Sequence, residues 1–430
     1  MRIAVYTDSR ALTTWSWKGL ADGDLPLSGT DGPILRLPAE LAGQDCKVVL
    51  YCTKPPTDQS VVPALLVGGL PEAVLEARRA EVDVLVFNNR ANQDTAAGIS
   101  MCDRLGVRCV VWDQNGPSPD FMDILLSPAV RRLVCVSVAQ ANELRDHPVF
   151  YKTQVIHNSL HSIHTAEPAI VDRNTRAQTV CFLGALTPSK GFHHLARAWP
   201  AVHACCPDAR LLVIGSSALY GANRFGTLGI GDPEYEANFI APYLGHSRAE
   251  LRELGVTLVG LANPARVREI LCGSAIGVVN PNCAGSIETF CVSAIEIQAT
   301  GAVVVGARAG GLRETVLHRR TGILIRNECD LAHAIVSLLR SPRDLVEMGQ
   351  NGRKWVLAAF RQEVIIAQWS DLLRSVARDE PVRRKIPLSL KGASPKVLAK
   401  ESIRIMRKVP FVGSRLMTLH HLRERLSHPT

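Results

Sequence analysis

Two glutamates, Glu288 and Glu296, lie where a loop of small polar residues gives way to a mostly apolar segment. A carboxylate accepts two hydrogen bonds side by side, which suits the paired hydroxyls of a ribose or a hexose. In a helix this spacing amounts to about two turns, so both carboxylates would lie near one face. The apolar neighbours of Glu296 predict that it is partly buried and has a partner. On spacing alone, two solvated helix positions are the simpler explanation of the pair.

The loop before these glutamates offers a place for a phosphate. A strand is predicted to end at Asn280, and a helix to open near Thr289. The first turn of a helix has N–H groups without intrahelical partners and a partial positive charge, which together attract anions. The sequence therefore predicts that a phosphate and sugar hydroxyls bind around one helix start.

Short β-branched runs alternate with helical stretches along most of the chain, which predicts parallel sheets with helices on both faces. In the first half we predict helices over Pro33–Ala42 and Thr95–Leu105, and strands over Ile3–Thr7, Lys47–Tyr51, Val82–Phe87, Arg108–Trp112, Arg132–Val136 and Gln154–Ile156. The second half repeats the pattern with strands over Val180–Leu183, Arg210–Ile214, Val256–Val259, Ile276–Val279, Ala302–Val305 and Gly322–Ile325. Its helices are predicted over His193–Ala204, Pro264–Cys272, Thr289–Ala299, Leu312–His318 and Cys329–Leu339.

These two series predict an α/β fold of two tandem Rossmann-like, doubly wound domains with an inter-domain cleft. Ligands of such folds bind outside the carboxyl ends of the strands. The segment Ser216–Pro242 is long for a loop and is predicted to be a functional insertion. The predicted parts are an N-terminal domain (1–165), a linker (166–178), a C-terminal domain (179–360), a helix (361–380) and a basic tail (381–430).

The net charge of +9 is concentrated in the tail. Residues 381–430 contain 12 Lys and Arg against 2 Asp and Glu, so the rest of the chain is close to neutral. A near-neutral body argues against nucleic acid as a partner. The 12 cysteines include no C-x-x-C pair and no Cys/His cluster at zinc spacing, which favours reduced thiols. The chain begins with a strand pattern rather than a signal peptide, so we expect a cytoplasmic protein.

The end of the tail has an amphipathic pattern. Four leucines of the segment Ser414–Leu426 recur along one side, with arginines elsewhere. A short basic helix at the surface of an anionic membrane has this pattern, and would place the protein peripherally at the inner face. A solvated tail, or a helix docked on the body, explains the pattern equally well.

From Glu288 onward the sequence resembles the retaining glycosyltransferases of family 4, whose fold is called GT-B. Their hallmark is Glu, seven residues and Glu, followed by a Gly-Gly-x-x-Glu turn. Here Glu288, Phe290, Glu296 and the turn Gly310–Glu314 reproduce it in order. The resemblance implies a nucleoside diphosphate sugar as donor, held by the C-terminal domain. It places Glu296 on the ribose hydroxyls and Glu288, as a catalytic residue, near the transferred sugar, with Thr289 and Phe290 as donor-binding neighbours.

A second element, from Gly184 to Lys190, resembles the V-G-R-L-x-x-x-K-G loop of the same family. The resemblance implies that Gly184 and Lys190 bind the donor. Lys190 would neutralise the departing diphosphate, whose charge grows as the glycosidic bond breaks. Ala185 departs from the pattern, because the family usually has Arg there. Arg224 and Arg308 are candidates for the missing contact.

The N-terminal domain carries weaker signals. Gly29, between Ser28 and Asp31, resembles a Gly-Gly-x-Glu loop that faces the diphosphate, although a plain turn before a helix fits as well. Asp113 stands after a strand where family members often have His. It could contact the sugar or the acceptor as a catalytic residue, or form a turn. Trp15 and Trp17 could form a platform for the acceptor or simply pack together.

The predicted function is transfer of a sugar to a glycan or lipid-linked acceptor with retention of anomeric configuration, in cell-envelope or exopolysaccharide synthesis. No cofactor and no metal ion are expected, since Asp22 and Asp24 have the form of a metal motif but read as a solvated turn. A catalytically silent partner subunit and a sugar-nucleotide 2-epimerase remain alternatives. An NAD-dependent dehydrogenase is disfavoured, because no G-x-G-x-x-G follows either first strand.

Overall fold

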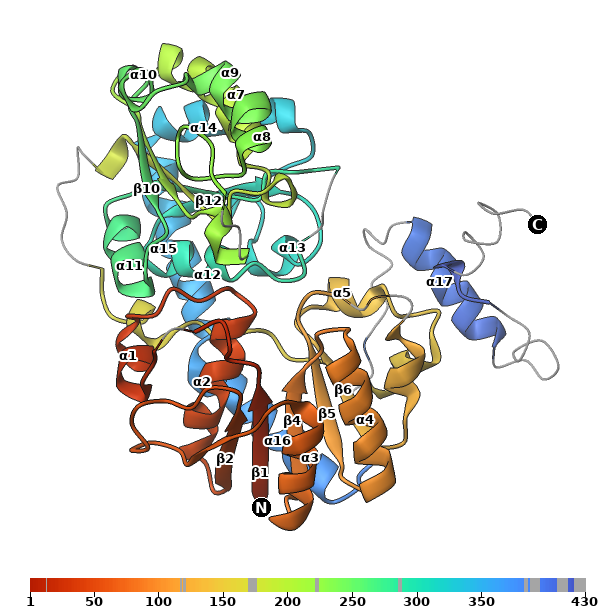
Figure 1. The fold of residues 1–430 in the computed structure, drawn as a ribbon. Helices are drawn as coiled ribbons and strands as arrows, with labels where there is room; N and C mark the ends of the chain where they lie inside the picture. The colour runs from red at the N-terminus through yellow and green to blue at the C-terminus, as the bar shows by residue number, and fades with distance from the viewer. Residues whose placement is uncertain are drawn as a thin grey trace. The chain divides into compact units, whose positions relative to one another are not determined.

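The computed structural model describes residues 1–12, 14–116, 118, 121–168, 176–220, 224–284, 288–382, 386, 395–407 and 417–420. The chain divides into two compact α/β units (Figure 1). Unit 1 comprises Met1–Trp17, Ile34–His157 and Ile366–Thr430. Unit 2 comprises Lys18–Pro33 and Asn158–Ile365. A short segment near the N-terminus thus belongs to the unit built from the second half of the chain.

Within the described residues, unit 1 contains a seven-stranded sheet in the order β3-β2-β1-β4-β5-β6-β7. Every pair of neighbouring strands is parallel. The six predicted strands are present, and β3 is an additional one that the sequence did not reveal because it is short and partly exposed. The strands are β1 (Arg2–Thr7), β2 (Lys47–Cys52), β3 (Ala64–Leu66), β4 (Val84–Asn88), β5 (Cys109–Asp113), β6 (Val130–Cys135) and β7 (Thr153–Val155).

The helices of unit 1 cover the sheet and follow local sequence signals. In α4, Asn92 caps the N-terminus by accepting a hydrogen bond from the Thr95 amide at 2.9 Å, and Gly106 ends the helix in the left-handed conformation. α3 and α4 pack against each other. The helices are α2 (Asp31–Ala42, in unit 1 from Ile34), α3 (Leu70–Arg79), α4 (Gln93–Leu105), α5 (Val138–Asn142), α16 (Gln362–Ala377, in unit 1 from Ile366) and α17 (Pro395–Met406).

Unit 2 contains a second parallel sheet, of six described strands in the order β10-β9-β8-β11-β12-β13. Both sheets have the doubly wound arrangement, with a reversal of strand order next to the first strand: between β1 and β4, and between β8 and β11. The six strands predicted in this half are all present. They are β8 (Thr179–Leu183), β9 (Arg210–Ile214), β10 (Val256–Gly260), β11 (Ile276–Val279), β12 (Val303–Ala307) and β13 (Gly322–Ile325).

The helices of unit 2 enclose this sheet around a core that includes Phe182 and Trp199, both fully buried. α7 packs against α14, and α12 packs against α15. The longer helices are α7 (Phe192–Cys205), α11 (Pro264–Cys272), α12 (Val292–Ala299), α14 (Leu331–Leu339) and α15 (Pro342–Ala359). Shorter ones are α1 (Trp17–Asp22, in unit 2 from Lys18), α10 (Arg248–Glu253) and α13 (Leu312–Thr315).

The segment Ser216–Pro242, predicted as an insertion, contains a series of short helical turns. It contains η6 (Ser217–Tyr220), α8 (Pro233–Tyr235), the π-helix η7 (Glu236–Ile240) and the start of α9 (Ala241–Leu244). The buried carboxylate of Glu236 accepts hydrogen bonds from the amides of Leu228, Ile230 and Gly231, each at 2.7 Å. Three backbone N–H groups satisfy the buried carboxylate, so hydrogen bonds inside the insertion hold its described part together.

Two predictions fall largely outside the described residues. Residues 169–175 of the predicted linker 166–178 lie outside the described residues. Of the amphipathic segment Ser414–Leu426, only residues 417–420 are described. Among the helices that the structure describes, none is both long enough and apolar enough to cross a membrane.

Candidate functional site

The predicted site residues of unit 2 meet at its topological switch point. Lys190 follows β8, and Glu288 follows β11, the two strands between which the strand order reverses. Their side chains form an ion pair in which Lys190 Nζ donates to Glu288 Oε1 at 2.6 Å. Ligands of doubly wound sheets bind at this position. The structure therefore brings together two residues that are 98 positions apart in the sequence.

Asn280 is a third member of this cluster, and the sequence analysis gave it no role. Its side-chain amide donates to the same Glu288 Oε1 at 3.0 Å. Its φ of 26° lies outside the regions that side chains ordinarily adopt, so its backbone is strained. The sequence signal that could have identified Asn280 is its position as a polar residue directly after a buried strand. Together Lys190 and Asn280 hold the carboxylate of Glu288, which is 10% exposed, in one orientation.

The Gly-Gly turn fixes the backbone beside Glu288. The amide of Gly311 donates to the carbonyl of Glu288 at 2.8 Å. A Cβ at Gly311 would lie 2.2 Å from the carbonyl oxygen of Thr289, so only glycine permits this approach. The turn between β12 and α13 thus packs directly on the segment from Glu288 to Phe290.

Thr289 and Phe290 lie next to Glu288 but differ in accessibility. Thr289 is partly buried, whereas the Phe290 ring is fully buried and packs edge-on against Phe360 with 5.5 Å between the ring centroids. A donor contact at Phe290 would therefore be made through its backbone.

The helix after this segment begins later than predicted. α12 starts at Val292 rather than near Thr289, because Cys291 has a φ of 74° and lies outside the helical region. The N–H groups at the start of α12 consequently belong to Val292 and the residues after it. A Cβ at Gly29 would be 3.6 Å from Val292 Cγ2, so the Gly29 loop lies beside this helix start in unit 2.

Ser28 and Asp31 cap α2. The Ser28 hydroxyl accepts from the Asp31 amide at 3.0 Å and donates to the Asp31 carboxylate at 2.7 Å. The plain turn before a helix is therefore present at this loop. The donor contact at Gly29 stays a prediction.

Glu296 is partly buried on α12 and faces a histidine. Its Oε1 lies 3.7 Å from Nε2 of His164, whose side chain is completely buried. The prediction that Glu296 is partly buried beside a partner is confirmed. His164 comes from the short turn η4 (Ser162–His164). His164 could not be predicted from the sequence, because nothing near it links it to a residue so far along the chain.

Gly184 lies where the loops after β8 and β9 nearly touch. A Cβ at Gly215 would be 1.9 Å from the Gly184 carbonyl oxygen, so the second loop needs glycine at this position. Ala185, at the position where the resembled family usually has Arg, is buried. Arg224 and Arg308, the two candidates for the missing contact, are both exposed.

Asp113 belongs to unit 1, whereas the other predicted site residues belong to unit 2. It ends β5, is fully buried, and accepts hydrogen bonds from Asn89 Nδ2 at 3.3 Å and Gln140 Nε2 at 3.2 Å. Burial raises the pKa of Asp113 to about 7. It is thus a carboxyl group that changes charge near neutral pH, and its catalytic role stays a prediction.

Burial settles two other expectations. Trp15 and Trp17 are buried and pack edge-on against each other, so the platform interpretation is wrong and the packing interpretation is confirmed. Asp22 and Asp24 are exposed at the end of α1 around Gly23, as expected of a solvated turn. Among the described residues, no group of three or more His, Cys, Asp or Glu side chains could hold a metal ion.

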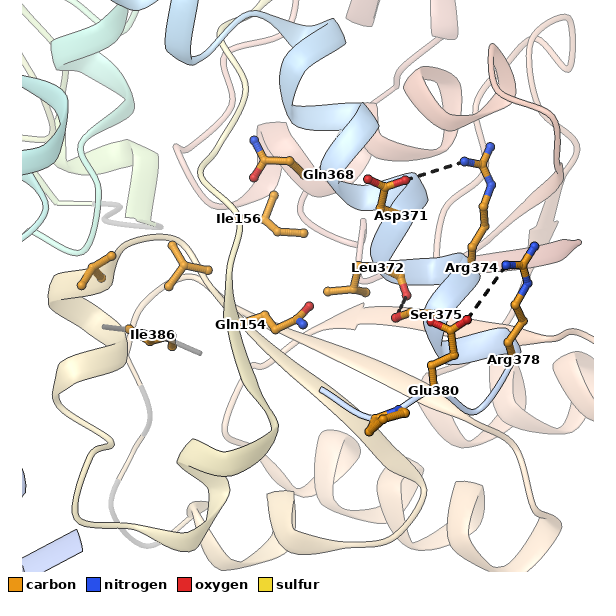
Figure 2. A pocket seen from close by; sticks show the side chains of 13 residues that line it. Gln154, Ile156, Gln368, Asp371, Leu372, Arg374, Ser375, Arg378, Glu380 and Ile386 are labelled. Atoms are coloured by element: carbon orange, nitrogen blue, oxygen red, sulfur yellow. Dashed lines mark hydrogen bonds and ion pairs between the residues drawn. The ribbon is translucent and has the colours of Figure 1, made fainter. Parts of the chain in front are cut away.

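Unit 1 also contains a cavity of about 780 Å³ between β7 and the end of α16 (Figure 2). Gln154 and Ile156 line it from one side, and Asp371 and Arg374 from the other. Figure 2 shows Asp371 paired with Arg374, and Glu380 paired with Arg378, at 3.8 and 4.0 Å. None of the predicted site residues lines this cavity, so it is separate from the predicted donor site.

The cluster in unit 2 is chemically suited to an anionic ligand that is rich in hydroxyl groups. A lysine can meet a phosphate, and two carboxylates can each accept hydrogen bonds from paired hydroxyls. The segment that carries these residues also matches a known family. Residues 177–341 match the family described as "Glycosyl transferases group 1".

A curated relative matches part of the chain. Over 198 residues the chain is 28% identical to the GDP-mannose-dependent alpha-(1-6)-phosphatidylinositol monomannoside mannosyltransferase of Mycobacterium tuberculosis. This match covers 46% of this chain and 47% of that protein. The chain thus spans about half the length of the curated relatives it matches.

Solved structures match over most of the chain. Anabaena HepE in complex with UDP has a TM-score of 0.63 and 16% identity, and the match covers 87% of this chain and 100% of that one. A glycosyltransferase from Rickettsia africae has a TM-score of 0.65 and 13% identity, over 88% and 99%. Likeness at this identity establishes the fold. The predicted architecture of two doubly wound α/β domains of the GT-B type is confirmed.

Proposed function

We propose that this chain transfers a sugar from a nucleoside diphosphate sugar to a glycan or lipid-linked acceptor, with retention of anomeric configuration, in cell-envelope or exopolysaccharide synthesis. One observation carries the proposal. Lys190, Asn280 and Glu288 meet at the switch point of unit 2, inside the segment that matches the group 1 glycosyl transferases. The names of the relatives support a nucleotide-linked donor, since one uses GDP-mannose and another was solved with UDP.

Each residue of the cluster has a distinct role in this proposal. Glu296 accepts hydrogen bonds from the ribose hydroxyls, and Glu288 accepts them from the transferred sugar. Lys190, in contact with Glu288, stabilises the negative charge that grows on the departing diphosphate. Lys190 and Glu288 thus lie on the two sides of the bond that breaks, with Lys190 at the diphosphate and Glu288 at the sugar. The acceptor attacks on the face that the diphosphate leaves, which retains the configuration at the anomeric carbon.

The proposal includes no metal ion and no cofactor. Lys190 and the start of α12, with Gly29 beside it, meet the charge of the diphosphate. We also propose a cytoplasmic location, with residues 381–430 in peripheral contact with an anionic membrane surface. The support for this contact is the charge of the tail, 12 basic against 2 acidic residues.

A second candidate is a catalytically silent partner subunit. Ala185 favours it, because a buried alanine replaces the arginine that the resembled family usually has at the diphosphate. Slow hydrolysis of the donor in the absence of acceptor would exclude it.

The donor site is tested by thermal unfolding in the presence of UDP, GDP, ADP and their sugar conjugates. A ligand that binds only the folded state raises the apparent stability, by about 2.7 kcal/mol at one hundred times Kd. We expect one nucleotide family to raise the Tm of the wild type, and Glu296→Ala and Lys190→Met to lose most of that shift.

The matched control is Glu253→Ala, which removes an exposed carboxylate on α10 of the same unit and should keep the full shift. The absence of any nucleotide shift in the wild type would contradict the proposal. The anomeric configuration of the product, followed by NMR, tests retention separately.

A further inference from the structure

The helix α17 buries two charged side chains together with Ile403, and it exposes three other apolar side chains. Lys400 and Glu401 are buried against the rest of unit 1, whereas Leu398, Ile405 and Met406 are 40, 55 and 41% exposed. Leu398 lies about two helical turns from Ile405 and Met406, so the three residues lie on one side of the helix. An ordinary surface helix has the opposite arrangement. We call Leu398, Ile405 and Met406 the outer face of α17.

The charged side is held to unit 1 by a network of ion pairs. Glu401 accepts from the buried Arg145 at 3.1 Å, and from Arg404 of its own helix at 2.8 Å. Arg404 and Arg145 hold the pKa of Glu401 below its usual range. Lys400 pairs with Asp146 at 3.4 Å. Because these contacts fix the rotation of α17 about its axis, they also decide which side chains point away from unit 1.

The tail that contains the outer face is basic in its sequence. The tail that contains α17 carries 12 Lys and Arg and only 2 Asp and Glu, and one of those two acids, Glu401, is turned inward. Within α17 itself, Lys396 pairs with Glu143 at 2.6 Å, so the positive charge that attracts a bilayer is that of the tail as a whole. An exposed apolar stripe in a strongly basic segment is the combination that binds the interface of an anionic bilayer.

We infer that the outer face of α17 is the surface through which this chain docks on an anionic lipid bilayer, with the helix lying in the plane of the interface. The inference rests on the membrane contact in the proposed function. The inference narrows the membrane contact from the whole tail to the outer face of α17. It also explains why Lys400 and Glu401 are turned toward the rest of unit 1.

Two other arrangements fit less well. A helix of 12 residues is about 18 Å long, against roughly 30 Å for the hydrocarbon core of a bilayer, so α17 cannot span it. A second copy of the chain would bring two strongly basic tails together, and like charges would repel. An anionic bilayer matches the apolar outer face in polarity and the basic tail that contains it in charge.

The experiment measures partition of the full chain onto vesicles of phosphatidylcholine with 30% phosphatidylserine, and onto vesicles of phosphatidylcholine only. The double variant Leu398→Asp/Ile405→Asp places two carboxylates on the outer face. We expect it to lower the partition coefficient on anionic vesicles at least tenfold, and to leave the Tm unchanged because both positions are exposed. We expect the wild type to bind neutral vesicles weakly and to lose most of its binding at 0.5 M NaCl.

The matched control is Val346→Asp/Leu261→Asp, which changes two exposed apolar residues of unit 2 and should bind like the wild type. Unchanged binding of the α17 variant would overturn the inference. So would equal binding to neutral vesicles, or a dimer in light scattering that dissociates in the α17 variant.

The thermal shift with nucleotide separates this inference from the proposed transfer reaction. We expect the α17 variant to keep the full nucleotide shift. If the wild type shows no nucleotide shift but still requires the outer face for vesicle binding, the transfer reaction fails and the docking surface stands. If the nucleotide shift is normal but the wild type does not bind anionic vesicles, the docking surface fails and the transfer reaction stands.

Discussion

Asp113 is a buried carboxyl group held by two side-chain amides rather than by a cation. The donors are Asn89 and Gln140, and burial is the main reason that its pKa rises to about 7. The folded chain therefore keeps the proton up to about pH 7, whereas the unfolded chain releases it near pH 4. The stabilising contribution of Asp113 is complete below pH 4, and it is lost as the pH rises through 7.

Asp113→Asn should remove this pH dependence. Between pH 4 and 8 the group lowers the unfolding free energy of the wild type by up to about 4 kcal/mol, whereas the amide of the variant has no proton to lose. Urea denaturation at pH 5 and pH 8 measures the difference. The control is Asp371→Asn, an exposed carboxylate of the same unit. Equal pH slopes in the wild type and Asp113→Asn would show that Asp113 does not titrate in this range.

If Glu296 binds the ribose as proposed, His164 is a positioning residue for the donor, since it acts through Glu296. Its buried ring lies 3.7 Å from the carboxylate that the proposal places on the ribose. His164→Gln should raise the KM for the donor about tenfold, the equivalent of about 1.4 kcal/mol, and change kcat little. A steady-state assay at varied donor concentration measures both constants. His246→Gln, at an exposed site, should change neither. A fall in kcat with an unchanged KM would contradict the positioning role.

At the scale of elements, the site depends on close approach between turns and strands. The turn at Gly310 and Gly311 lies against the backbone of Glu288 and Thr289, with no room for a side chain. The loops after β8 and β9 are equally close at Gly184 and Gly215. Such contacts hold the loop that carries Glu288 by its backbone, independently of its side chains.

Gly311→Ala should therefore disturb the site, although it adds only one methyl group. The added methyl group would be 2.2 Å from the Thr289 carbonyl, so the loop must shift, and we expect a loss of about 1–3 kcal/mol in stability. The nucleotide-dependent thermal shift should fall as well, because Glu288 moves with the loop. Gly273→Ala is the control, since its Cβ would meet only the Ile270 carbonyl at an ordinary 3.5 Å. If both variants behave alike, the close approach has no effect on the site.

At the scale of the whole molecule, charge is divided unevenly between a nearly neutral body and a strongly basic tail. The described part of the tail is bound to unit 1 through Arg145, which is buried, and Glu401. Removal of one partner of a buried ion pair leaves an uncompensated charge. The tail is thus coupled to the stability of unit 1.

Glu401→Gln should lower the stability of unit 1 by on the order of 2 kcal/mol, because Arg145 loses its charged partner. Urea denaturation measures the loss, and limited trypsin digestion should release the tail faster than in the wild type. The surface variant Asp371→Asn serves again as control, since it is exposed on the same unit. Equal trypsin rates would mean that this pair does not hold α17.

The sequence by itself determined the two series of strands and most helices. Central parallel strands are buried on both faces, so they read as short continuous apolar runs that can be found without a partner. β11 and β13 begin and end at the predicted residues. β3 was missed because an edge strand is not buried in this way. The start of α12 was misplaced because the left-handed conformation of Cys291 is not visible in its residue type.

Only the tertiary structure decided which residues meet. Lys190 and Glu288 were predicted separately, but their contact, the strained Asn280 and the buried His164 depend on loops and turns far apart in the sequence. The orientation of α17 also depends on its partners, because ion pairs with Arg145 and Asp146 hold its inner side. The local sequence pattern depends on neighbours along the chain, whereas a site or a docking face consists of residues that only folding brings together.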